Sequence, residues 1–224
     1  MPDAFVGLLL SVILYAIGSS LIEVLVSPMV EACPTDNKAS VMSLLHSFYC
    51  WGTVIVIICS TGFMYFLGKS SWPLLAFLWA AIPLANAVYF SQVPIATLSD
   101  AENSMSLKEI FTQKIFWLFV ILMFAVGASE LAMSQWASPF AESGLGISKA
   151  AGDLAGPCLF AVLMGISKIF YAKFSEKINL LTCITGSSFL CIAAYLLAAL
   201  SPSPVLALVG CALCGLSPAY SGTI

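Results

Sequence analysis

The chain has 224 residues, of which 61% are hydrophobic and only 8% charged, and its mean hydropathy is +1.03. A soluble domain of this length cannot bury so much apolar surface, so the composition excludes a soluble globular protein. The formal net charge of -3 says little about partners, because most charges lie between the apolar stretches. The composition therefore indicates an all-helical, multi-pass membrane protein.

Seven apolar stretches follow one another along the chain. Each is long enough to cross the ~30 Å hydrocarbon core of a bilayer as a helix of roughly 20 residues. We expect Pro28 to end the first span and Pro139 to end the fourth, and we expect no cleavable signal peptide, because no basic segment precedes Phe5. The predicted spans are 4–26, 40–67, 73–92, 115–139, 150–171, 178–200 and 205–224.

The longest polar connection, 93–114, separates the first three spans from the last four. It contains Asp100, Glu102, Lys108 and Glu109, which are typical of a solvated linker. We therefore interpret 1–92 and 115–224 as two helical groups joined by this linker.

The orientation is predicted from lysine alone, because the chain has no arginine. Short cytoplasmic loops collect positive charge. One set of alternate connections holds six lysines and the opposite set only two, which places the N-terminus outside and the linker and C-terminus in the cytosol. The six are Lys38, Lys108, Lys114, Lys168, Lys173 and Lys177, and the two are Lys69 and Lys149.

Several predicted spans carry polar side chains that share one helical face. Inside a bilayer such groups cost about 2.5–3.5 kcal/mol on insertion scales, so they normally face a partner or a water-filled cavity. The first span has Ser19, Glu23 and Ser27; the second has His46, Tyr49 and Thr53; the third has Asn86; the fourth has Gly127, Glu130 and Ser134, followed by Gln135 and Trp136.

Glu23 and Glu130 are the strongest functional candidates among these residues. A helix bundle needs no carboxylate in mid-membrane for stability, and desolvation disfavours the charged form, which suits such a group to carry a proton. Tyr49 and Trp136 can supply aromatic walls for a polar solute. For His46 both an interfacial and a functional role stay open, and Asn86 is better explained as a hydrogen-bonding contact between helices than as a binding residue.

The order of these motifs resembles the major facilitator superfamily of transporters, in its fucose-permease-like, sugar-transporting branch. Gly18–Pro28 resembles the fourth helix of that branch and Leu44–Gly52 the fifth, while Gly127–Trp136 resembles the seventh helix of related permeases. Gly165–Lys177 resembles the short basic loop between the eighth and ninth helices, with Lys168 where arginine is usual.

The resemblance implies a twelve-helix fold of which the chain covers helices four to ten, as a piece of a longer protein. Residues 1–92 would then be the last three helices of the N-terminal half-bundle, 93–114 the cytosolic linker, and 115–224 the first four helices of the C-terminal half-bundle. By the same resemblance Glu23 takes part in proton coupling and sugar recognition, and we extend this role to Glu130. Lys168 and Lys173 are assigned to the gating loop.

We therefore expect a secondary transporter that moves a small polar solute, such as a sugar, by alternating access and by proton symport. The solute, protons and the lipid bilayer are the expected partners, in the plasma membrane. The full-length protein is expected to be a monomer. His46, Tyr49, Asn86, Gln135 and Trp136 join the two carboxylates as predicted substrate- or proton-binding residues. We expect no cofactor, no metal and no nucleic acid.

Two alternatives to an active transporter stay open. One is a polytopic membrane enzyme, although Gly165-Ile-Ser167 and Gly186-Ser-Ser188 lie spans away from the single histidine. The other is a truncated, inactive piece of a transporter. A seven-helix receptor or pigment is disfavoured because the last span has no mid-membrane lysine.

Overall fold

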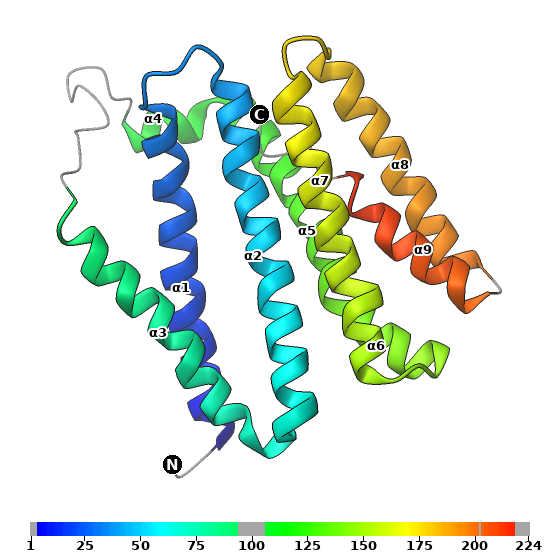
Figure 1. Ribbon diagram of the computed structural model, residues 1–224. Helices are drawn as coiled ribbons and strands as arrows, with labels where there is room; N and C mark the ends of the chain where they lie inside the picture. Colours follow the sequence, from blue (N-terminus) through cyan, green and yellow to red (C-terminus); the bar gives the residue numbers. More distant parts are fainter. Residues whose placement is uncertain (1–3, 94–105, 202, 218–224) are drawn as a thin grey trace.

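The computed structural model describes residues 4–93, 106–201 and 203–217, and this part of the chain is helical without any strand (Figure 1). The elements are α1 (Ala4–Glu31), α2 (Lys38–Leu67), the 3-10 turn η1 (Lys69–Ser71), α3 (Trp72–Phe90), α4 (Leu107–Thr112), α5 (Lys114–Leu145), α6 (Lys149–Asp153), the π-helical turn η3 (Leu154–Cys158), α7 (Leu159–Phe174), α8 (Leu180–Leu200) and α9 (Pro204–Cys214).

Six helical segments are long and apolar enough to cross a membrane, which confirms the all-α membrane fold class. One of them, Lys149–Phe174, runs through α6, η3 and α7. The seventh predicted span is not confirmed, because α9 has only 11 residues and residues 218–224 lie outside the described part. A helix of that length rises about 16 Å, roughly half of a hydrocarbon core.

The prediction that Pro28 and Pro139 end their helices is wrong. α1 continues past Pro28 to Glu31, and α5 continues past Pro139 to Leu145. A proline removes one backbone hydrogen bond, yet long apolar helices tolerate it where neighbouring groups satisfy the freed carbonyl. α5 ends instead at Gly146, whose φ of 67° is the left-handed conformation that commonly closes a helix.

The predicted linker 93–114 contains a short helix, α4, that the sequence analysis did not anticipate. Its start is a capping box: the Glu109 backbone N–H donates to Ser106 Oγ (3.3 Å), and the Ser106 N–H donates to Glu109 Oε2 (2.9 Å). Trp117 Nε1 then donates to the Phe111 carbonyl (3.0 Å), which holds α4 against the start of α5. Asp100 and Glu102 lie outside the described residues.

The most extensive helix packing joins α2 of the first group to α7 of the second, and α8 to α9. Glycines allow both approaches. A Cβ at Gly165 of α7 would lie 3.3 Å from Cys50 and Trp51 of α2, and a Cβ at Gly210 of α9 would lie 2.7 Å from the Ala198 backbone nitrogen of α8. The α2–α7 contact thus connects the two groups of helices, whose identity as two half-bundles stays a prediction.

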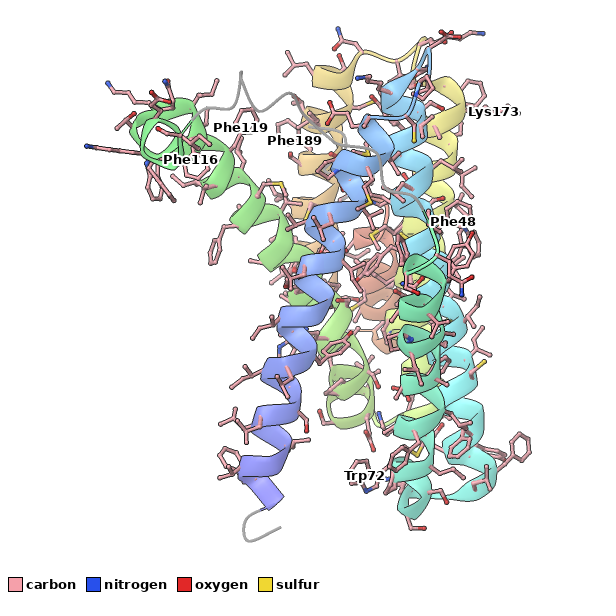
Figure 2. All side chains as sticks on the ribbon, turned by 90° about the vertical axis from the view of Figure 1, so that its left-hand side faces the viewer. Phe48, Trp72, Phe116, Phe119, Lys173 and Phe189 are labelled. Carbon is pink, nitrogen blue, oxygen red and sulfur yellow. The ribbon has the colours of Figure 1, made fainter. Side chains whose placement is uncertain are left out.

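The bundle has two ends, which Figure 1 shows clearly. The start of α2, α4, and the end of α7 lie at one end, called the α4 end below, whereas η1 and α6 lie at the other, called the α6 end. Figure 2 places Lys173 and Trp72 at these opposite ends. Which end faces the cytosol stays a prediction.

α1 and α3 flank α2 and leave most of their side chains exposed. Apolar residues such as Phe48 (68% exposed) and Trp72 (58%) also project outward (Figure 2). In a bilayer these surfaces meet lipid tails, which are as apolar as the side chains themselves, so their exposure is expected of a membrane protein. The Trp79 indole N–H donates to Ser60 Oγ (3.1 Å) and links α3 to α2.

Candidate functional site

A cavity of about 920 Å³ lies between α2 on one side and α5, α6, η3 and α7 on the other. It extends from Tyr49 and Glu130, near the middle of their helices, to Lys69 and Lys149 at the α6 end. Both lysines are exposed, so the cavity reaches the surface at that end. Its size is within the range of small-molecule sites.

The deep part of the cavity combines a carboxylate with hydroxyl groups and apolar walls. Glu130 and Ser134 lie one turn apart on the same face of α5, and Tyr49 and Thr53 lie one turn apart on α2. Met164 of α7 contributes to the apolar lining. A few polar groups on a mostly apolar wall are the usual composition of a site that orients a polar solute.

Asp153 organises the mouth of the cavity. Its carboxylate accepts one hydrogen bond from Ser138 Oγ of α5, a charged bond from Lys149 Nζ (3.1 Å) and a long bond from Thr61 Oγ1 of α2 (3.5 Å). One aspartate thus links three helical elements. Ser138 is buried, so the carboxylate supplies the partner that its hydroxyl needs.

The π-helical turn η3 directly follows Asp153. Pro157 lacks a backbone N–H, and a wider turn accommodates the missing bond within an otherwise continuous helix. Gly156 of this turn lies so close to α5 that a Cβ would be 3.0 Å from the Ala137 Cβ. This close approach brings Asp153 within reach of Ser138.

Hydrogen bonds join α2 to α7 and the turn after it at the α4 end. Ser43 Oγ donates to the Lys168 carbonyl (2.8 Å), and Ser40 Oγ donates to the Ala172 carbonyl (2.6 Å). At the last turn Asn37 Nδ2 donates to Ser175 Oγ (3.1 Å) and to Glu176 Oε1 (3.2 Å). We call these contacts the α4-end clasp, a term that covers Asn37, Ser40 and Ser43 with their partners on and after α7.

The structure brings Tyr49 and Glu130 together, as the shared-face analysis predicted for each helix separately. Both line the cavity. Glu23 is exposed on α1 and does not line the cavity, but it lies close enough to interact electrostatically with both Tyr49 and Glu130. Its predicted role stays a proposal.

The other predicted binding residues lie away from the cavity lining. His46 is half-buried on α2, one turn nearer the α4 end than Cys50. Asn86 is exposed on α3. Gln135 and Trp136 are exposed on a different face of α5 from Glu130, with Trp136 68% exposed. An outward-facing tryptophan does not form the aromatic wall expected of it in this conformation.

The assignment of Lys168 to a loop is wrong. α7 continues to Phe174, so Lys168 lies well inside the helix and only 6% of it is exposed. Lys173 also belongs to α7, in its exposed last turn. Lysine is usually expected in the loops of a membrane protein because it is charged. A lysine inside a membrane helix can instead face a carboxylate.

The sequence analysis missed Asp153 and Lys149 as cavity residues. The signal was present, since Asp153 is a carboxylate inside the predicted span 150–171 and the argument that selected Glu23 and Glu130 applies to it equally. Lys149 precedes it by one turn, the spacing of an ion pair along a helix. The described residues contain no cluster of three or more histidine, cysteine or acidic side chains suited to a metal ion.

The described residues form a helical membrane protein with a solute-sized cavity between its helices. The family model of the Major Facilitator Superfamily matches residues 2–223. The chain therefore belongs to this superfamily of membrane transporters. Neither the curated proteins nor the solved structures contain a match.

Proposed function

We propose that this protein is a secondary active transporter that moves a small polar solute, with neutral sugars as the first class to test, by alternating access and proton symport. The cavity between α2 and α5–α7, with Glu130 in its deep part, is the observation that carries this proposal. The proposed location is the plasma membrane, with the α4 end in the cytosol and a monomer as the working unit.

The contrast between the two ends of the α2–α7 pair supports alternating access. The clasp joins α2 to α7 by hydrogen bonds at the α4 end, whereas toward the α6 end a cavity opens between α2 and α5, beside the apolar contact of α2 with α7. A transporter of this kind exposes one central site to one side at a time, by rocking one group of helices against the other. We propose that this arrangement is the state open at the α6 end.

The polar groups of the cavity support a hydroxylated solute. Tyr49, Thr53 and Ser134 offer hydroxyls that donate and accept, and Glu130 offers strong acceptors. Sugars present both kinds of partner around an apolar ring face, which an aromatic side chain can cover. Organic acids and nucleosides use the same scaffold type, so the assignment of a solute must come from transport itself.

Proton coupling is proposed for the two carboxylates, with Glu130 first because it lines the cavity. Glu23 of α1 interacts electrostatically with Glu130, so that neutralising one of the two carboxylates favours the charged form of the other. A carboxylate that protonates when the site faces one side and releases the proton on the other couples solute movement to the proton gradient.

The test is transport by the purified protein in liposomes with an imposed pH gradient. We expect accumulation of at least one neutral hexose, accompanied by proton movement that a dye inside the vesicles reports. Glu130→Gln and Glu23→Gln should abolish accumulation driven by the pH gradient while leaving solute exchange in place. Glu142→Gln, which changes an exposed carboxylate on the same helix α5, is the matched control and should behave like the unchanged protein.

Unchanged accumulation in both variants would refute the coupling role of these carboxylates. Transport of organic acids or nucleosides without any hexose would refute the sugar assignment and leave the transporter assignment intact.

A further inference from the structure

Lys168 is a buried cation within a membrane helix. Only 6% of this residue is exposed, and the helix is fixed at this point because Ser43 Oγ of α2 donates to the Lys168 carbonyl (2.8 Å). An ammonium group inside a bilayer is costly unless an opposite charge or water compensates it. A lysine near a helix end usually extends to the aqueous boundary, as Lys173 does in the exposed last turn. The burial of Lys168 argues against that explanation.

Lys168 lies next to the cavity, on the side of the α4 end. Phe160, Met164 and Lys168 follow one another at intervals of four residues and therefore share a face of α7. Phe160 and Met164 line the cavity together with Glu130 of α5. Lys168 lies one turn beyond Met164 toward the α4 end, where its backbone carbonyl accepts the Ser43 bond of the clasp.

Glu130 of α5 lies within electrostatic range of Lys168. From α2, the thiol of Cys50 is also within range of Lys168. Among the described residues the ion pair in direct contact is Lys149–Asp153, so Lys168 and Glu130 attract each other across a gap. In a low-dielectric bundle such an attraction is strong even without contact.

We propose that Lys168 is the counter-ion of Glu130, and that the two side chains form one charge unit on the side of the cavity nearer the α4 end. Lys168 is a positioning residue, because it acts on solute and proton through Glu130. A proton on Glu130, or a polar solute inserted between the two groups, weakens their attraction and frees α5 and α7 to move apart. This last consequence depends on the proposed transport function, whereas the charge unit itself does not.

The charge unit is tested first by a double-mutant cycle on thermal unfolding of the purified full chain, without any solute. Glu130→Gln leaves the buried Lys168 charge uncompensated and Lys168→Gln leaves the half-buried Glu130 charge uncompensated, so each should lower the unfolding temperature. The double variant should unfold at a higher temperature than the sum of the two single effects predicts. Lys173→Gln combined with Glu130→Gln is the matched control and should show additive effects, since Lys173 is exposed.

Additive effects for Glu130 and Lys168 would overturn the proposal. If a single variant fails to fold, the exchanged pair Glu130→Lys with Lys168→Glu gives the decision: a folded exchanged protein supports the charge unit, and a protein that folds no better than Glu130→Lys alone refutes it. Transport assays separate this result from the function. Coupled stability effects in a protein that transports nothing would keep the charge unit and refute the proposed function.

Discussion

The two ends of the α2–α7 pair differ in the kind of contact that they make. At the α4 end, hydroxyl and amide side chains of α2 donate to carbonyl and polar oxygens on and after α7. Toward the α6 end the same two helices pack through apolar side chains, with Val54 of α2 against Cys158 and Ala161, while a cavity lies beside them between α2 and α5. The long hydrogen bond from Thr61 joins α2 to Asp153 of α6 there. One helix pair thus combines polar contacts at one end with apolar contacts at the other.

The hydrogen bonds also differ in length between the two ends. Two bonds of the clasp are short, from Ser40 to the Ala172 carbonyl (2.6 Å) and from buried Ser43 to the Lys168 carbonyl (2.8 Å), whereas the Thr61–Asp153 bond is at the limit of hydrogen-bond length. A rocking motion would exchange these two conditions, with the clasp opening as the mouth closes around Asp153. The four predictions below test this contrast, beginning with the largest expected effect.

Water access should distinguish the two ends completely. In a protein whose native cysteines are replaced, Thr53→Cys places a thiol in the cavity, and Ser43→Cys places one in the buried clasp on the same helix. A water-soluble maleimide should label the first position and leave the second unlabelled, as measured by a mass shift of the intact protein. Labelling of Ser43→Cys alone would mean that the resting protein is open at the α4 end instead.

Gly165→Leu should separate α2 from α7 at the middle of the contact. A Cβ there already lies 3.3 Å from Cys50 and Trp51, so a larger side chain must displace α2. Overpacking of this kind lowers the free energy of unfolding by about 3 kcal/mol. Thermal unfolding in detergent measures it, and Gly186→Leu, on α8 with open space around its position, is the control. Equal stability of both variants would contradict the close α2–α7 packing.

Asp153→Ala should loosen the mouth. It removes the acceptor of buried Ser138 and the links to Lys149 and Thr61, which should lower the free energy of unfolding by about 2 kcal/mol. Thermal unfolding again provides the measurement. Lys149→Ala should cost clearly less, because an exposed ion pair contributes about 0–1 kcal/mol. A larger loss for Lys149→Ala would show that the ion pair, and not the Ser138 bond, holds the mouth.

Ser40→Ala should have the smallest effect, the loss of a single bond to the Ala172 carbonyl. The expected cost is about 1 kcal/mol. Because this bond belongs to the clasp, its loss should also favour the state open at the α4 end. Faster maleimide labelling of Ser43→Cys in the Ser40→Ala background would detect that shift. An unchanged labelling rate would show that the Ser40 bond does not keep the α4 end closed.

Much of the membrane architecture could be predicted from residue patterns along single helices. Apolar length alone located six of the spans, because a bilayer requires every backbone group to be satisfied within its own helix. Of the predicted polar faces, Glu130 and Ser134 of α5 and Tyr49 and Thr53 of α2 line the cavity, whereas His46, predicted on the same face of α2, does not. Helix ends were predicted less well: Pro28 and Pro139 lie inside α1 and α5, since proline weakens a long membrane helix without necessarily ending it.

Hydrophobicity along the chain is enough to define this as a membrane protein, and each polar face of a membrane helix needs a polar partner or water. Which faces meet depends on how the helices pack against one another. Trp136 is exposed outside the cavity, and Asp153 joins α5 and α2 at the mouth of the cavity. Lys168 is buried within α7 near Glu130 and does not lie in the expected loop. The reason is that a helical period fixes the side of a helix on which a residue lies, whereas its neighbour depends on contacts between helices far apart in the chain.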